Sequence, residues 1–280
     1  MRFVRRVALQ KATHDDGVRD ESLVMTAPSS PSLSTPPSAP LTAVADSEAV
    51  ASAALEVVRE CALEAVNRQG VFRMALSGGR TPQALYTLLA DETQLPWDHT
   101  DICFGDERLV PPDHPESNYG NARVLLDRPF VDPQRIYRMR GEISGPLAAL
   151  EYERTLRGIF LDRPWPVFDL ILLGLGADGH TASLFPHSAA VLETKLWVVS
   201  HYVDKLHAER LTLTLPVLNH ARTMVVLVAG EDKSEALQQM LEVSGPTEDV
   251  PARGIMKSGA NVRVIADAGA VRRLARVNKR

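Results

Sequence analysis

The 280-residue sequence has little of what would point to several large classes of protein. Its two cysteines, Cys61 and Cys103, both fall in predicted regular elements, which favours buried thiols in a reducing compartment over a disulfide framework. No apolar run approaches the roughly 18 residues that a membrane-spanning helix needs. The formal net charge of −4 provides no basic field for nucleic acid. We therefore expect a cytoplasmic protein with neither nucleic acid nor membrane as a partner.

The first part of the chain lacks the apolar residues of a folded core. Residues 24–40 are rich in serine and proline and carry too little apolar surface to order themselves. Residues 1–10 are basic but contain no apolar segment of the length a signal peptide needs, and acidic residues follow at once, which argues against secretion or import into an organelle. We predict a disordered tail over residues 1–42 and a single folded domain over residues 43–280.

Metal-ligand spacings and nucleotide-binding motifs are missing as well. The eight histidines show no spacing typical of a zinc site, and the Lys-Ser/Thr pair of a Walker loop is absent. Residues 174–179 match the pattern GxGxxG, but the acidic residue expected at the end of the following strand is missing, which argues against a dinucleotide. We expect neither a metal nor an organic cofactor.

What the sequence does contain, from Asp46 onward, is an alternation of apolar strands and amphipathic helices. This pattern is typical of an α/β domain with a mostly parallel sheet and helices on both faces. The predicted strands are 71–76, 102–104, 136–139, 170–173, 197–201, 210–215, 224–228 and 262–265, and the predicted helices are 47–67, 81–89, 118–126, 146–161, 231–241 and 268–277.

A glycine-rich turn follows the first predicted strand. It reads Ser77-Gly78-Gly79-Arg80-Thr81-Pro82, with Thr81 as the expected N-cap of the next helix and Pro82 as its first residue. The two glycines let the backbone approach an anion, and the helix N-terminus supplies free N–H groups. Ser77, Arg80 and Thr81 add hydroxyl donors and a positive charge. The turn predicts a phosphate-binding loop; an ordinary capped turn is the alternative.

A charged motif, Gly105-Asp106-Glu107-Arg108, follows the strand 102–104. Ligands of open α/β sheets bind beyond the carboxyl ends of the strands, so we predict that Asp106 and Arg108 contact the ligand. A solvated loop is the alternative. The proline-rich segment 110–117 that follows is placed to fold over the site. Asn118 comes directly after this segment, and we include Asn118 among the predicted ligand contacts.

The segment 168–186, FDLILLGLGADGHTASLFP, is the most informative part of the chain. An apolar strand leads into a glycine-rich turn that presents Asp178 and His180, with Thr181 and Ser183 as expected caps of a short helix. A carboxylate orients an imidazole and raises its basicity, which is the arrangement of acid–base catalysis. We predict that His180 and Asp178 are catalytic and that Gly176 leaves room for a sugar ring. A histidine satisfied within the core is the alternative.

Two basic residues complete the set of candidates. Arg210 opens the predicted strand 210–215, and Lys233 lies near the start of the helix 231–241, after Ala229-Gly230. Both are predicted contacts for an anionic ligand, and surface charges are the alternative.

Five segments of the chain, taken in order, carry a resemblance to a known family: SGGRTP, GDERLVPPDHPESNYGNAR, FDLILLGLGADGHTASLFP, ERLTLT and AGEDK. Over residues 43 to about 270 the chain resembles the 6-phosphogluconolactonases. The resemblance implies the α/β domain shared with glucosamine-6-phosphate deaminases. It also implies hydrolysis of 6-phospho-D-glucono-1,5-lactone to 6-phosphogluconate in the oxidative pentose phosphate pathway, without a cofactor. The family's catalytic histidine falls on His180, with Asp178 beside it. Its phosphate and sugar contacts fall on Ser77, Gly78, Gly79, Arg80, Thr81, Arg108, Arg210 and Lys233.

Two other functions fit the same fold. Deamination and isomerisation of glucosamine 6-phosphate would call for a carboxylate just after the DGH segment, in an Asn-Glu-Pro context, where this chain has Leu184-Phe185-Pro186. A sugar-phosphate sensor would bind without turnover, and such proteins commonly carry a DNA-binding segment, for which the first forty residues offer no helix-turn-helix pattern. Both are kept as alternatives to lactone hydrolysis.

Overall fold

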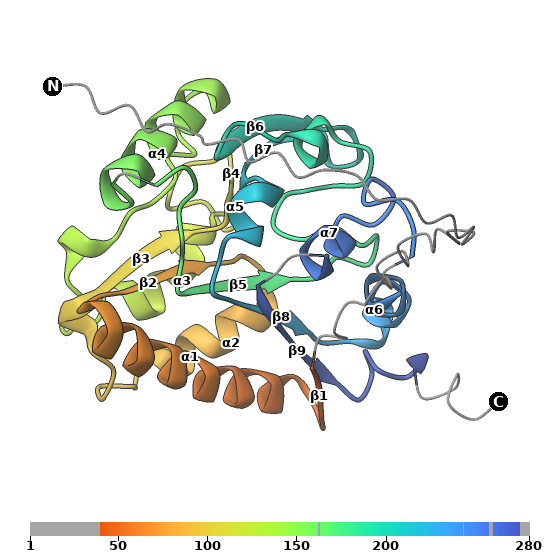
Figure 1. Cartoon of the computed structure of the whole chain (residues 1–280), viewed down its shortest axis with the longest axis horizontal. Helices are drawn as coiled ribbons and strands as arrows, with labels where there is room; N and C mark the ends of the chain where they lie inside the picture. The colour runs from red at the N-terminus through yellow and green to blue at the C-terminus, as the bar shows by residue number, and fades with distance from the viewer. Residues whose placement is uncertain (1–39, 162, 243, 258–259, 275–280) are drawn as a thin grey trace, which may run out of the picture. The chain divides into compact units, whose positions relative to one another are not determined.

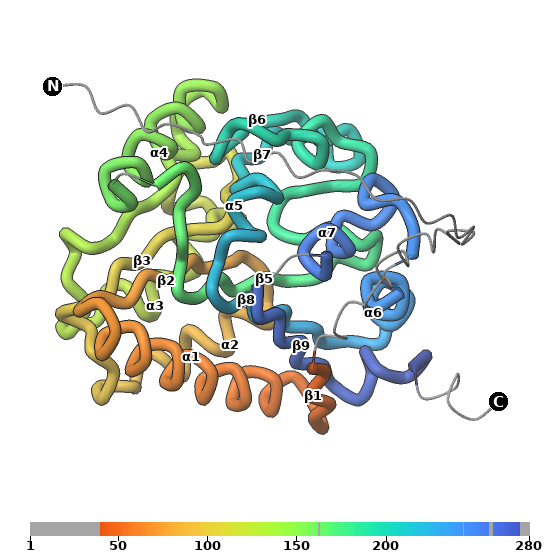
Figure 2. Tube along the Cα trace, in the orientation of Figure 1, coloured from red at the N-terminus to blue at the C-terminus, as the bar shows by residue number. Residues whose placement is uncertain are grey.

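A computed structural model describes residues 40–161, 163–242, 244–257 and 260–274, and Figures 1 and 2 follow their path by colour. Most of the expected disordered tail lies outside these residues. The prediction of disorder is wrong for the last residues of this tail. Leu41 and Thr42 belong to strand β1 (Leu41–Val44), which pairs with a strand near the C-terminus. This short, mostly exposed strand has no apolar alternation that would have revealed it.

The main sheet is parallel, and its strands lie in the order β1-β9-β8-β5-β2-β3. Every residue of β3 and β8 is buried, as expected for strands with both faces covered. The predicted parallel α/β architecture is confirmed. The bounds of the remaining strands are β2 Phe72–Leu76, β3 Thr100–Phe104, β5 Leu170–Gly174, β8 Thr223–Val228 and β9 Asn261–Asp267.

Helices cover both sides of this sheet. Figure 1 shows α1 (Ser47–Gln69) and α2 (Arg80–Leu89) together on one side, with α5 (Leu215–Asn219) and α7 (Ala252–Met256) on the other. The long helix α1 begins at the predicted cap Asp46 and ends at Gly70 in the left-handed conformation, with φ of 76°. The other helices are α3 (Asn118–Leu126), α4 (Gly145–Ile159) and α6 (Ser234–Leu241).

A second, antiparallel sheet was not predicted. It contains β4 (Asp106–Arg108), β7 (Ala208–Leu213) and β6 (Val198–Val203), in that order. Gly105 connects it to the parallel sheet, since its N–H donates to the Leu76 carbonyl and its carbonyl accepts from the Leu213 N–H, both at 2.8 Å. This link sets β4 and β7 beside the carboxyl end of β2.

Several predicted elements are wrong in detail. Residues 136–139 form only one isolated bridge, from Ile136 to Ile102, because the chain turns away after a single contact with β3. Thr181 and Ser183 cap no helix; their segment is a turn closed by a bridge from Thr181 to Leu184. Residues 268–273 are turns, and the rest of the predicted terminal helix lies largely outside the described residues.

Both cysteines are free and buried, as predicted. Within the described ranges, no helix combines the length and the apolar character needed to cross a membrane.

The cap of α1 offers a direct test of how this helix begins. Asp46 accepts a hydrogen bond from the Ala49 N–H at 2.9 Å. We expect Asp46→Ala to lower the free energy of unfolding by about 1 kcal/mol, because an N–H in the first turn loses its partner. Asp46→Ser, which keeps a capping oxygen, is the matched control in urea denaturation. Equal stability of Asp46→Ala and the parent would contradict the role of this cap.

Candidate active site

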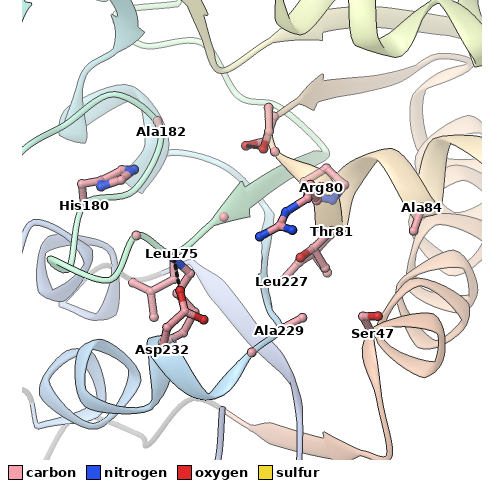
Figure 3. Close-up of a pocket in the computed structure, with 18 of the residues that line it drawn as sticks. Ser47, Arg80, Thr81, Ala84, Leu175, His180, Ala182, Leu227, Ala229 and Asp232 are labelled. Carbon is pink, nitrogen blue, oxygen red and sulfur yellow. Dashed lines mark hydrogen bonds and ion pairs between the residues drawn. The ribbon is translucent and has the colours of Figure 1, made fainter. Parts of the chain in front are cut away.

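The carboxyl ends of β2, β5 and β8 border a cavity of about 520 Å³ (Figure 3). A second cavity of about 310 Å³ shares six of its lining residues, so the two form one cleft. Twelve of the thirteen predicted site residues line this cleft. The larger cavity is lined by the predicted residues Ser77, Gly78, Gly79, Arg80, Thr81, Asp106, Arg108, Gly176, His180 and Lys233, and the smaller one adds Asp178 and Arg210.

The glycine-rich turn after β2 has the geometry of an anion-binding loop. The N-cap of α2 is Gly79, with φ of 105°, rather than the predicted Thr81, since the helix already begins at Arg80. The first N–H groups of a helix have no intrahelical partner, so those of α2 are available to a ligand. Figure 3 shows the Arg80 side chain beside Thr81 at the cavity. Arg80 has no hydrogen-bond or ion-pair partner within the described part of the chain.

Tyr86 supports this loop from the core. Its hydroxyl donates to the Ser77 carbonyl at 2.6 Å and accepts from the Ser77 N–H at 2.9 Å. Burial raises the pKa of the Tyr86 phenol, so the hydroxyl keeps its proton and its role as donor. The start of the loop is therefore fixed before any ligand arrives.

Asn118 lies behind the loop and is absent from the lining of both cavities. Its Nδ2 donates to the Asp106 carbonyl at 2.8 Å and to Asp106 Oδ1 at 3.1 Å. A Cβ at Gly78 would lie 2.0 Å from Asn118 Oδ1, so only glycine fits there. Asn118 thus orients Asp106 and packs against the loop, whereas the sequence predicted a ligand contact.

Glu107 is a buried carboxylate whose role sequence reasoning missed. It accepts hydrogen bonds from the backbone N–H groups of Arg108, Asn118 and Tyr119 and from the Ser117 hydroxyl. Burial raises the pKa of Glu107, against the effect of these donors. Side chains alternate along a strand, so in β4 Glu107 faces away from Asp106 and Arg108. This alternation is the sequence signal that could have separated Glu107 from the two cleft residues beside it.

The centre of the cleft is an imidazole paired with a carboxylate. His180 Nδ1 lies 2.5 Å from Asp178 Oδ1, and Lys205 Nζ donates to Asp178 Oδ2 at 2.9 Å. Burial would raise the pKa of Asp178, but the His180 and Lys205 interactions outweigh it and hold this pKa below its usual range. Because Asp178 is ionised, it is the acceptor for a proton on Nδ1, and Nε2 is the ring nitrogen without a hydrogen-bond partner among the described residues. Lys205 was not among the predicted site residues.

Two neighbours fix the plane of the His180 ring. A Cβ at Gly176 would lie 2.0 Å from His180 Nδ1, so the glycine is needed for the ring to lie against the backbone. The Phe185 ring stacks on the imidazole, with centroids 4.2 Å apart and planes at 29°. Gly176 therefore makes room for the histidine, in addition to lining the cavity as predicted.

Arg108 and Arg210 lie directly opposite each other on β4 and β7. Burial and the neighbouring Arg108 charge lower the pKa of Arg210, because both destabilise its charged guanidinium. Neither guanidinium has an ion pair with a carboxylate among the described residues. Two like charges opposite each other destabilise a sheet, and a bound anion would relieve that repulsion.

The charges of the cleft favour an anion over a cation. Lys233 lines both cavities, and its ammonium group lies 3.1 Å from Asp232 Oδ2. Among the described residues, the cleft is lined by five basic side chains and four carboxylates: Arg80, Arg108, Lys205, Arg210 and Lys233 against Asp106, Asp178, Asp232 and Asp267. No group of His, Cys, Asp or Glu side chains able to hold a metal ion occurs in the described ranges.

The structure is that of an α/β protein with a cleft at the carboxyl ends of its parallel strands, the place where such sheets bind ligands. The sequence matches the family described as Glucosamine-6-phosphate isomerases/6-phosphogluconolactonase over residues 45–264, and the chain belongs to this family.

Several individual proteins are similar to the chain. The 6-phosphogluconolactonase of a Nostoc species is 38% identical over 200 residues, which are 70% of this chain and 82% of that protein. The Synechocystis 6-phosphogluconolactonase is 40% identical, with the same shares covered. Among solved structures, the 6-phosphogluconolactonase from Trypanosoma cruzi matches with a TM-score of 0.76 and 29% identity, over 84% of this chain and 97% of that one.

The contact between Gly176 and His180 can be tested by adding one methyl group. In Gly176→Ala the new Cβ occupies the position of the imidazole, so we expect the ring to leave Asp178. The downfield Nδ1 proton resonance of His180 should disappear, and overpacking should cost about 1–3 kcal/mol of unfolding free energy. Gly105→Ala, whose Cβ would meet only the Leu76 carbonyl at 3.4 Å, is the control. Persistence of the resonance in Gly176→Ala would contradict this assignment.

The paired arginines predict that anions stabilise the fold. A ligand present at 100 times its dissociation constant stabilises a protein by about 2.7 kcal/mol, and we expect Arg210→Met to lose most of this gain for inorganic phosphate. The readout is the rise in Tm between phosphate and a weakly binding buffer. Arg154→Met removes an exposed arginine of α4 and should leave the rise intact. An equal rise in both variants would show that Arg210 does not bind the anion.

Proposed function

We propose that this protein hydrolyses 6-phospho-D-glucono-1,5-lactone to 6-phosphogluconate. The observation that carries the proposal is the 2.5 Å contact between His180 Nδ1 and Asp178 in the cleft that the glycine-rich loop after β2 also lines. The relatives described above support the same proposal, since each is named a 6-phosphogluconolactonase.

In the proposed reaction His180 moves one proton twice. Its free Nε2 takes a proton from a water molecule whose oxygen attacks C1 of the lactone, and Asp178 stabilises the imidazolium. When the bond between C1 and the ring oxygen breaks, the imidazolium returns the proton to that oxygen, which becomes the C5 hydroxyl. The products are a carboxylic acid at C1, which releases its proton to solvent and becomes the carboxylate, and a neutral imidazole, ready for the next cycle.

Arg108 is the best candidate to stabilise the oxyanion of the tetrahedral intermediate. The glycine N–H groups of the turn after β5 were an alternative, but the N–H of Gly176 donates to the His180 carbonyl and that of Gly179 to the Gly176 carbonyl. Both are therefore engaged within the turn. Arg108 lines both cavities beside His180, and its Nε is buried without a partner in the described part of the chain.

The phosphate group would bind away from the bond that breaks. The loop from Ser77 to Thr81, the N-terminus of α2 and Lys233 offer N–H groups, hydroxyls and charge on one side of the cleft, and Arg210 adds a second guanidinium. Binding energy gained there can be used to hold C1 over His180 Nε2. This division gives the phosphate site a role in turnover as well as in affinity.

The position after the DGH segment argues against the deaminase alternative. Leu184 and Phe185 are both buried, and Phe185 stacks on the His180 ring. The place where assisted ring opening would call for a carboxylate is thus occupied by apolar packing.

Replacing the histidine tests the mechanism. We expect His180→Ala to lower kcat by about 10² to 10⁴, the usual contribution of general acid–base catalysis, while the affinity for 6-phosphogluconate changes little. His99→Ala, at an exposed histidine near the opposite end of β3, is the matched control. Near-normal kcat in His180→Ala would rule out this residue as the base.

The reaction itself is tested by following freshly generated 6-phosphogluconolactone with the purified protein, against its spontaneous hydrolysis. Acceleration that is lost in His180→Ala supports both the activity and its central residue. Absence of acceleration together with binding of 6-phosphogluconate would favour a sensor. Absence of both would contradict the proposed substrate.

A further inference from the structure

His201 lies next to the site but has no part in the mechanism described above. It is a half-buried residue of β6, paired with Arg210 on β7. Its Nε2 lies 2.7 Å from the Ser183 carbonyl, so Nε2 must carry a proton and donate it. Its Nδ1 is buried and has no partner within the described ranges. Burial, together with the positive charge of Arg210, lowers the pKa of His201 and keeps the ring neutral.

The acceptor of this hydrogen bond belongs to the segment that carries His180. Besides its carbonyl, Ser183 is held by its N–H, which donates to Thr212 Oγ1 at 3.2 Å, and by its Oγ, which donates to Asp106 Oδ2 at 2.6 Å. Ser183 is thus fixed to β4, β6 and β7 at once. Of these three bonds, the one from His201 alone holds the carbonyl, the group that sets the direction of the chain into Leu184 and Phe185.

His201 also reaches the aromatic ring that supports the imidazole. The rings of His201 and Phe185 have centroids 6.5 Å apart at 52°, while Phe185 stacks on His180 at 4.2 Å. The backbone before Phe185 and the Phe185 ring itself are therefore both in contact with His201.

We propose that His201 is a positioning residue for His180: through the Ser183 carbonyl and the Phe185 ring, it keeps the His180 imidazole against Asp178 with Nε2 free. Two histidines in one site would then be held in opposite neutral tautomers, the proton on Nδ1 in His180 and on Nε2 in His201. The kinetic part of this inference rests on the proposed function, whereas the tautomers can be measured without it.

The variants His201→Phe and His201→Gln separate the hydrogen bond from the packing. His201→Phe keeps a ring beside Phe185 but removes the donor, and His201→Gln keeps an N–H donor at a similar distance from the backbone. We expect His201→Phe to lower kcat by about 10- to 100-fold, the scale of loss from a small misplacement of reacting groups, with unchanged affinity for 6-phosphogluconate. His201→Gln should recover most of the kcat.

The second readout is the tautomer of each imidazole, measured by two-bond ¹⁵N–¹H NMR correlation in the ¹⁵N-labelled protein, with His180→Ala and His201→Phe used for assignment. We expect His180 as the pure Nδ1–H form in the parent and as a mixture of forms in His201→Phe. Phe185→Leu removes the aromatic ring that contacts both His180 and His201, and it should produce the same mixture of His180 tautomers. This variant replaces His201→Phe in the test if His201→Phe does not fold.

Three results would overturn the inference: parental kcat in His201→Phe, equal losses in His201→Phe and His201→Gln, or an unchanged His180 tautomer in both His201→Phe and Phe185→Leu. If the parent does not hydrolyse the lactone, the proposed function fails, and the NMR comparison alone decides whether His201 positions His180.

Discussion

The close approach of the His180 ring to the backbone at Gly176 is the constraint on which the site depends. It requires a residue without a side chain at that position, and it requires the chain to reverse within four residues. Gly179 makes that reversal in the left-handed conformation, with φ of 81°, and its carbonyl accepts a hydrogen bond from the Ala252 N–H of α7. The turn is thus anchored from outside, and Asp178 meets the imidazole without a further adjustment of the backbone.

The sequence predicted the parallel sheet, and nearly all of its candidate site residues line the cleft, because both predictions depend on local signals. Buried strands are continuous apolar runs, and the residues that follow them gather at one edge of the sheet. Ser77, Asp106, Asp178 and His180 were found in this way. The strand β1 was missed because its four residues are mostly exposed and pair with a strand far along the chain, which leaves no periodic pattern in the sequence.

The remaining errors concern side chains whose role is decided by tertiary packing. Asn118 was expected at the ligand, yet it faces Asp106 and the back of Gly78. Glu107 shares a charged motif with two cleft residues but points into the protein, where it binds the start of α3. Lys205 looked like a surface charge until the β6–β7 connection brought it to Asp178. Composition and spacing do not encode which of these side chains tertiary packing brings together.

Gly105 is the residue through which the antiparallel sheet is joined to the parallel one. The proposed proton-transfer pair belongs to a turn of the parallel sheet, whereas Arg108 and Arg210 belong to the antiparallel one. The two sets are nevertheless linked, because Ser183 of that turn is hydrogen-bonded to Asp106 of β4 and to Thr212 of β7. Evolution of a new ligand preference in this scaffold is therefore confined to those positions of the antiparallel sheet that do not contact the turn.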